Sequence, residues 1–203
     1  MRMGVFGGTF NPIHNGHLHL LQAAKEALQL DHVLLIPTKI PPHKVPEQLA
    51  SEQDRLTMCR LATQHLPWVS ISDLEMRREG PSYTVDTLRA LYTNHPQYEL
   101  YLLMGGDMLL TVDRWFQSDR IALMACVVGL AREKDEYERL TAHLTVLERL
   151  GFTARVIDVP PLPNSSTAVR AGDLSALPES VADYIRSHHL YGQNHQLPQE
   201  DLL

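Results

Sequence analysis

The chain has 203 residues, of which 44% are hydrophobic and 21% are charged. This length favours one compact domain, and the composition excludes the disordered, collagen-like and membrane-embedded classes of protein. Eighteen lysines and arginines against 24 aspartates and glutamates give a net charge of -6, which argues against non-specific binding to nucleic acid or to an acidic membrane. Any bound phosphate must therefore be held by a local site.

The cysteines indicate a reducing compartment, and the first residues do not resemble a secretory signal segment. Cys59 and Cys126 each lie in an apolar stretch and match no metal-ligand spacing, so we expect buried thiols. Residues 1–3 lead straight into Gly4 with too few apolar residues for a signal segment, and no apolar run approaches the roughly 20 residues of a membrane span. The sequence therefore predicts a cytoplasmic protein with neither nucleic acid nor membrane as a partner.

Short apolar runs typical of strands alternate with stretches of helical spacing. The runs comprise residues 5–6, 33–36, 69–71, 100–103, 126–128 and 156–159. The spacing of a buried helix face is followed by Leu20, Leu21, Ala24, Ala27 and Leu28, and later by Leu140, Leu144, Leu147 and Leu150. Alternation of strand and helix favours parallel strands with right-handed crossovers, so the predicted fold class is α/β with a doubly wound parallel sheet.

We expect one domain over residues 1–192 and a polar tail without periodicity over residues 193–203. Two proline clusters, at 37–46 and 160–163, directly follow predicted strands, where proline disfavours both helix and ladder pairing. Because ligands of a doubly wound sheet bind at the carboxyl ends of its strands, these clusters are expected to form loops over the ligand edge.

The first strand runs into the segment GGTFNPIHNGH, residues 7–17, and a helix is predicted to begin at about Gly16. Glycines let the backbone approach a ligand closely, and a helix start presents unpaired N–H groups to an anion. His14 and His17 lie three residues apart, where both rings can face one phosphate. Two histidines do not complete a zinc site. The pattern predicts a phosphate site, with ordinary surface histidines as the alternative.

A second polar segment, SSTAVR, covers residues 165–170. Serine and threonine are typical N-cap residues, so a plain helix cap is the default interpretation of this run. Arg170 lies about one helical turn beyond Thr167, where its forked cation can reach an anion bound at the same helix start. A cap and a phosphate clamp can coexist.

These two segments resemble the GGTFxPxHxGH and SSTxxR motifs of the HxGH nucleotidyltransferase superfamily, and residues 3–191 most resemble bacterial nicotinate-nucleotide adenylyltransferases. The resemblance implies a Rossmann-like fold and transfer of the adenylyl group of ATP to nicotinate mononucleotide, giving deamido-NAD and pyrophosphate in NAD biosynthesis. The residues that it implies for ATP are Gly7, Gly8, Thr9, Phe10, His14, His17, Gly105, Asp107, Ser166, Thr167 and Arg170. The implied catalytic groups are His14, His17, Lys44 and Arg170.

Two middle segments resemble the parts of that family that hold the mononucleotide. Residues 41–44 are similar to its proline loop, whose basic residue, here Lys44, binds the mononucleotide phosphate; a solvated lysine in a turn is the alternative. Residues 81–88 are similar to its PSYTxxTL segment, in which backbone N–H groups beside Tyr83 and Thr84 receive the nicotinate carboxylate. The residues alone leave it equally open that Ser82 or Thr84 caps a helix running to about residue 94.

Three further positions match the family. Asp107 follows the fourth predicted strand, where it suits ribose hydroxyls or an ion; a turn or cap is the alternative. The resemblance implies that Trp115 stacks on the pyridine ring, whereas most tryptophans are simply core residues. Arg132 matches a basic position near the substrate pocket, although such an arginine is usually solvated. Asn164 departs from the family, in which an apolar residue commonly precedes the SST run.

The implied reaction needs no protein base, because a phosphate monoester with a second pKa of about 6 is already largely dianionic near neutral pH. Catalysis then comes from in-line positioning and charge neutralisation, with Mg²⁺ bound with ATP as the expected cofactor and no metal held by protein ligands alone. The alternatives are a sister transferase, pantetheine-phosphate adenylyltransferase or cytidylyltransferase, and a non-catalytic nucleotide-binding protein. The sequence leaves monomer and homodimer open.

Overall fold

A computed structural model describes residues 1–39, 49–160 and 166–192, and in it six parallel strands form one sheet. The strands are β1 Arg2–Gly8, β2 His32–Pro37, β3 Val69–Ile71, β4 Glu99–Gly105, β5 Ala125–Ala131 and β6 Ala154–Asp158. Their order is β3-β2-β1-β4-β5-β6, and each neighbouring pair is parallel. The chain order reverses between β1 and β4, which is where ligands of doubly wound sheets bind.

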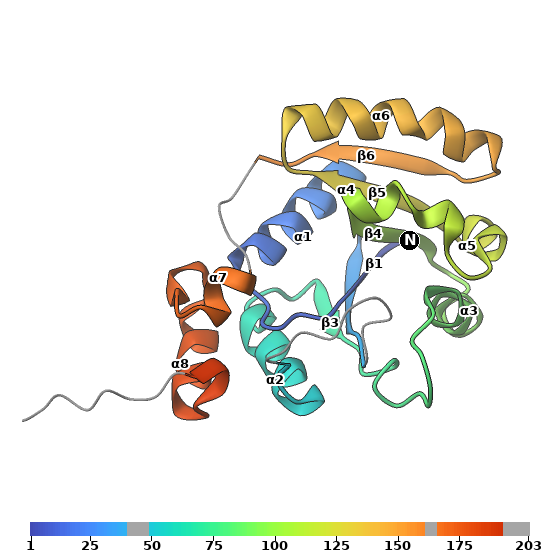
Figure 1. The fold of residues 1–203 in the computed structure, drawn as a ribbon. Coiled ribbons are helices and arrows are strands. Elements are labelled where there is room, and N and C mark those ends of the chain that lie inside the picture. The colour runs from blue at the N-terminus through green and yellow to red at the C-terminus, as the bar shows by residue number, and fades with distance from the viewer. Residues whose placement is uncertain (40–48, 161–165, 193–203) are drawn as a thin grey trace, which may run out of the picture.

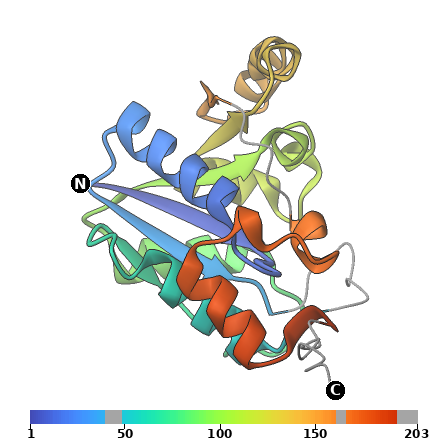
Figure 2. The same cartoon turned by 90° about the vertical axis from the view of Figure 1, so that its left-hand side faces the viewer.

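Helices join the strands and cover both faces of the sheet (Figure 1). They are α1 Asn15–Leu28, α2 Glu52–Thr63, α3 Thr84–Asn94, α4 Gly106–Leu109, α5 Ser118–Met124, α6 Lys134–Arg149, α7 Ser166–Arg170 and α8 Glu179–Ser187, with short 3₁₀ turns η1 Val112–Arg114, η2 Leu174–Ala176 and η3 Leu190–Gly192. Buried side chains of α1, α2 and α8 form one apolar cluster, and those of α3, α5 and α6 form another. Figure 2 shows α8 beside α2 on the first of these faces.

Strand β5 shows how this packing produces the apolar runs in the sequence. All seven residues of β5 are buried. Val128 packs into the cluster with α1, whereas its neighbour Val127 packs into the cluster with α3. Because both faces are covered, the strand is apolar throughout and does not alternate with polar residues. The predicted doubly wound α/β fold is confirmed.

Most of the predicted element positions are confirmed. Every apolar run lies in a strand, except that Val159 follows the last residue of β6. The first helix begins at Asn15, one residue before the predicted start. The prediction for Ala27 is wrong: this residue is exposed, because it lies at the margin of a stripe centred between Ala24 and Leu28. Leu150 is also not buried, being 54% exposed just after α6 ends.

Parts of the predicted loops and the predicted tail lie outside the described residues. Pro37 is the last residue of β2, so the first proline cluster begins within the strand, and residues 40–46 of that cluster are not described. The same holds for residues 161–163 and 193–203. Among the helices that the structure describes, none combines the length and the apolar character needed to cross a bilayer.

Candidate active site

The turn after β1 is fixed by the packing of Phe10. A Cβ added at Gly8 would lie 2.9 Å from Cζ of Phe10, so glycine is required for this ring to pack against the strand end. Phe10 has a φ of 45°, which is costly for a bulky residue. Its ring is buried edge-on against Phe6 and His17, at centroid distances of 5.6 and 5.2 Å. The ring of Phe10 is therefore not available to a ligand.

His14 and His17 lie together at the start of α1, as predicted for a phosphate site. Their ring centroids are 3.8 Å apart. The backbone N–H of His14 donates to Nδ1 of His17 over 3.2 Å, so the proton of a neutral His17 ring sits on Nε2. Nδ1 of His14 is buried and has no hydrogen-bond partner among the described residues. The pair thus offers ring nitrogens that the protein itself does not fully use.

Both histidines are held neutral near physiological pH. Burial, reinforced by the positive charge of Arg132, lowers the pKa of His14 to about 4. Burial also holds the pKa of His17 well below its usual value, with smaller contributions from His14 and Arg132. An incoming anion would reverse this balance, because a negative charge close to the rings favours their protonated forms.

Arg132 lies beside the end of β4. A Cβ at Gly105 would lie 3.0 Å from Oδ1 of Asp107 and 3.6 Å from Nη2 of Arg132, so these two side chains flank the end of β4. Gly106 leaves room for Glu136, whose Oε2 accepts the backbone N–H of Arg132 over 2.7 Å. The resemblance implies that Arg132 binds the mononucleotide. In the structure, however, its positive charge helps to lower the pKa of His14 and of His17.

The late polar segment reaches the same turn from the far end of the chain. Arg170 in α7 donates through Nη1 to the carbonyl oxygen of Asn11 over 2.8 Å and through Nη2 to Oγ1 of Thr167 over 3.3 Å. The structure thereby brings Thr167 and Arg170 to residues 7–11, which we call the glycine turn. Ser166 is the first residue of α7, while Lys44 lies outside the described residues.

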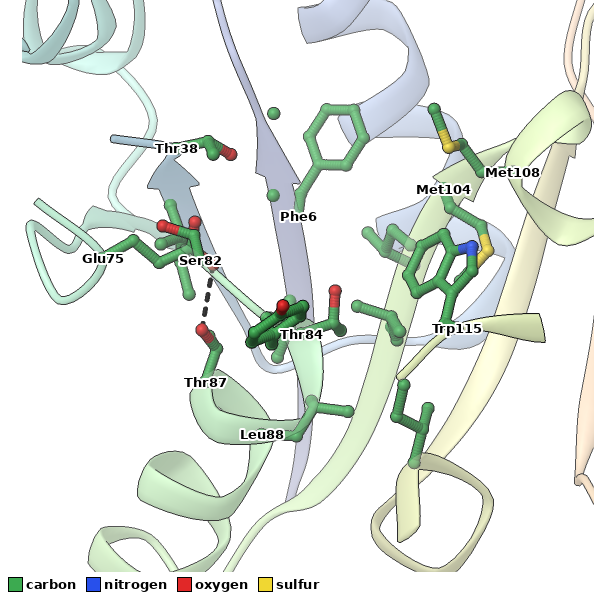
Figure 3. Close-up of a pocket in the computed structure, with 18 of the residues that line it drawn as sticks. Phe6, Thr38, Glu75, Ser82, Thr84, Thr87, Leu88, Met104, Met108 and Trp115 are labelled. Atoms are coloured by element: carbon green, nitrogen blue, oxygen red, sulfur yellow. Dashed lines mark hydrogen bonds between the residues drawn. The ribbon is translucent and has the colours of Figure 1, made fainter. Parts of the chain in front are cut away.

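A pocket of about 490 Å³ adjoins the glycine turn (Figure 3). Gly7, Gly8 and Thr9 line one part of it. In Figure 3 the indole of Trp115 lies across the cavity from Glu75. Other predicted residues in the lining are Gly105, Tyr83 and Thr84. Predicted residues that lie outside this lining, within the part of the chain that the structure describes, are Phe10, His14, His17, Asp107, Arg132, Thr167 and Arg170.

Helix α3 begins in this pocket without a side-chain cap. Its N-cap residue is Tyr83, and no side chain in the described structure caps the helix. The first helical hydrogen bonds run from the N–H groups of Asp86 and Thr87 to the carbonyl of Tyr83. The N–H groups of Thr84 and Val85 are therefore not used by the helix. Of the two interpretations of this segment, capping by Ser82 or Thr84 is not observed, which leaves these donors for an anion.

Sequence reasoning missed two buried charged residues near the pocket. Glu75 lines it and accepts a hydrogen bond from Oγ1 of Thr87 over 2.9 Å, and burial raises the pKa of its carboxyl group. Nη1 of Arg78 donates to the same Thr87 hydroxyl over 3.2 Å. Arg55 in α2 is fully buried. Glu75 and Arg55 both lie in charged stretches of sequence that are typical of solvated surfaces, so no local pattern distinguishes them from exposed residues.

Comparison with known proteins agrees with this geometry. The sequence model of the cytidylyltransferase-like family matches residues 5–172, which defines the class. A probable nicotinate-nucleotide adenylyltransferase of Synechococcus sp. (strain JA-3-3Ab) is 39% identical over 196 residues, covering 94% of each chain. One from Listeria monocytogenes (strain EGD-e) is 35% identical over 195 residues, covering 95% of this chain and 98% of that protein.

A solved structure shares the fold. Plasmodium falciparum nicotinic acid mononucleotide adenylyltransferase, complexed with NaAD, has a TM-score of 0.76 and 19% identity, covering 95% of this chain and 98% of that one. The sequence matches, at 39% and 35% identity over nearly the whole chain, identify the family more narrowly than the class alone. The chain belongs to the nicotinate-nucleotide adenylyltransferase family.

Proposed function

We propose that this protein transfers the adenylyl group of ATP to nicotinate mononucleotide, producing deamido-NAD and pyrophosphate in NAD biosynthesis. The observation that carries the proposal is that the glycine turn is shared. Residues 7–9 line the pocket in which α3 begins. The turn to which they belong leads directly to His14 and His17 at the start of α1. A mononucleotide in the pocket and a triphosphate at the histidines would therefore meet at this turn.

The reaction follows from the donors around the turn. The phosphate of the mononucleotide attacks the α-phosphorus of ATP, and the bond from that phosphorus to the bridging oxygen breaks as pyrophosphate leaves. Nε2–H of His17 is the donor proposed for the α-phosphate, where negative charge develops in the transition state. His14, Thr167 and Arg170 are proposed to hold the β- and γ-phosphates, and Arg132 adds positive charge on the same side.

We further propose that Mg²⁺ comes with the nucleotide. Among the described residues no group of three His, Cys, Asp or Glu side chains is arranged to hold a metal ion. The donor chemistry fits an ion whose oxygen ligands are phosphates and waters, since the histidines and Arg170 are placed as hydrogen-bond donors. When bound, the ion would neutralise charge on the phosphate oxygens.

The pocket suits the mononucleotide end of the reaction. Trp115 offers an aromatic face for the pyridine ring. The N–H groups of Thr84 and Val85 are proposed to receive the nicotinate carboxylate at the helix start, where an anion is favoured. Lys44 remains proposed for the mononucleotide phosphate.

A pyrophosphate-release assay tests this function. ATP is offered with nicotinate mononucleotide, nicotinamide mononucleotide or pantetheine phosphate, and CTP replaces ATP in a parallel series. We expect the fastest release with ATP and nicotinate mononucleotide, and a dinucleotide product by mass spectrometry. Release with pantetheine phosphate or with CTP instead would favour a sister transferase. Nucleotide binding without release from any pair would indicate a non-catalytic protein, and a mixed anhydride product would indicate a carboxylate-activating ligase.

Binding of ATP is expected to be coupled to proton uptake by His14. The ring is neutral in the free protein because its pKa is about 4, and a bound polyphosphate should raise that pKa. By linkage, ATP should then bind more tightly as the pH falls from the raised pKa towards the value in the free protein. Calorimetry at about pH 6 in two buffers of different ionisation enthalpy counts the protons taken up.

His14→Gln is the reference for this measurement, because ATP's own titration contributes equally to both proteins. Wild type should take up more protons per ATP than the variant. Equal uptake would show that the triphosphate does not lie against His14.

A further inference from the structure

The side chain of Arg55 is fully buried, and its guanidinium group makes hydrogen bonds to four backbone carbonyl oxygens. Nη1 donates to the oxygens of Thr9 and Thr38 over 2.8 and 2.7 Å. Nη2 donates to Lys39 over 3.2 Å and Nε to Ala50 over 3.3 Å. Four of the five N–H groups of the guanidinium are therefore used on main chain.

These carbonyls belong to three segments that meet at the site. Thr9 follows β1 and Thr38 follows β2, the adjacent parallel strand, and both residues line the pocket. Ala50 lies just before α2, and its own N–H donates to Oδ1 of Asn11 over 3.0 Å. One side chain thus links the glycine turn, the end of β2 and the start of α2.

The bond to Thr9 also sets the direction of a donor. In a trans peptide the carbonyl and the following N–H point in opposite directions. Among the described residues the cis peptide bond is the one between Asn11 and Pro12, so the Thr9–Phe10 peptide is trans. Because the Thr9 carbonyl faces Arg55, the N–H of Phe10 faces away from it. The Thr38–Lys39 peptide is oriented in the same manner.

We infer that Arg55 is a positioning residue for adenylyl transfer: it holds the Phe10 N–H towards the nucleotide phosphates and fixes the spacing of the β1 and β2 ends. This inference rests on the function proposed above. Burying a cation is unfavourable unless its donors are paired. An apolar side chain of similar length would fill the same space without that penalty, so the distinctive contribution of the guanidinium is its set of directed donors.

Arg55→Lys and Arg55→Ala test this role, with the exposed Arg60→Lys on the same helix as the matched control. Both Arg55 variants are assayed at a temperature where circular dichroism shows them fully folded. We expect kcat to fall by about a hundredfold, the effect typical of a small displacement of reacting groups, with a smaller change in KM. Millimolar guanidinium should restore part of the kcat of Arg55→Ala. The control should retain wild-type kinetics.

Wild-type kcat and KM in a folded Arg55→Lys protein would overturn the inference, as would activity that falls only in step with the folded fraction and is not rescued by guanidinium. Should neither variant fold, NMR of the wild-type protein decides. Exchange of the Arg55 guanidinium hydrogens should slow when ATP binds, while exchange at Arg60 is unchanged; no slowing at Arg55 would overturn the inference. This NMR measurement with ATP needs no turnover, so it separates failure of the proposed role of Arg55 from failure of the proposed function.

Discussion

His17→Ala is expected to lower kcat by about a hundredfold while changing ATP affinity little, because a donor aimed at developing charge acts mainly in the transition state. The backbone N–H of His14 occupies Nδ1 of His17, which leaves Nε2–H as the donor of the neutral ring. Steady-state kinetics give kcat, and ATP titration by calorimetry gives the affinity. A wild-type kcat in this variant would restrict His17 to a packing role against Phe10 and His14.

Two further substitutions separate chemistry from packing at this position. The amide of asparagine reaches about as far as Nδ1 of the ring and that of glutamine about as far as Nε2, so His17→Gln retains a donor at the distal position and His17→Asn does not. We expect His17→Gln to be the more active of the two at equal folded fraction. The reverse order would contradict the assignment of Nε2–H to the α-phosphate.

The second large effect concerns the acid and amide forms of the mononucleotide. The specificity constant for nicotinate mononucleotide is expected to exceed that for the nicotinamide form by at least about a hundredfold, since a charge-assisted hydrogen bond is replaced by a mismatched one. The proposed donors are the N–H groups of Thr84 and Val85, which the helix itself does not use. Comparable kcat/KM values for the two substrates would contradict this use of the helix start.

Thr84→Pro tests that donor directly. Thr84 is the first residue of α3, a position at which proline fits a helix while lacking the N–H. Tyr83 already has the extended conformation that proline requires of its predecessor, with φ of -81° and ψ of 132°. The variant should lose roughly tenfold or more in kcat/KM for the acid and little for the amide. Thr84→Ala keeps the N–H and should keep the preference, and Trp115→Ala should weaken both substrates alike.

The sequence predicted those parts of the fold and site that depend on neighbouring residues. An apolar run followed by glycines and a helical stripe is a local signal, so β1, the glycine turn and α1 could be read directly. The proximity of His14 and His17 could likewise be predicted, because both come directly after this turn. The absence of a side-chain cap on α3 could not be predicted from the sequence, because serine and threonine at the start of a helix are equally typical of a capped helix.

The contacts that tertiary packing creates could not be predicted. Arg55 lies in the polar segment that begins α2 and becomes fully buried only because the ends of β1 and β2 present carbonyls to it. The hydrogen bond from Arg170 to Asn11 joins residues 159 positions apart. The effect of the Arg132 charge on the histidines likewise depends on the pairing of β4 with β5, which brings Arg132 to the end of β4. None of these partners lies within reach of a local pattern.

The uncapped start of α3 has a consequence for how substrate preference could change over evolution. If main-chain N–H groups read the carboxylate, ordinary substitutions at residues 82–84 alter the surrounding side chains but leave the recognising atoms in place. Most single mutations in this segment are then silent with respect to the acid group, and a switch to the amide requires proline or a shift of the whole helix. Divergent side chains in this segment would therefore be a poor guide to which mononucleotide a relative accepts.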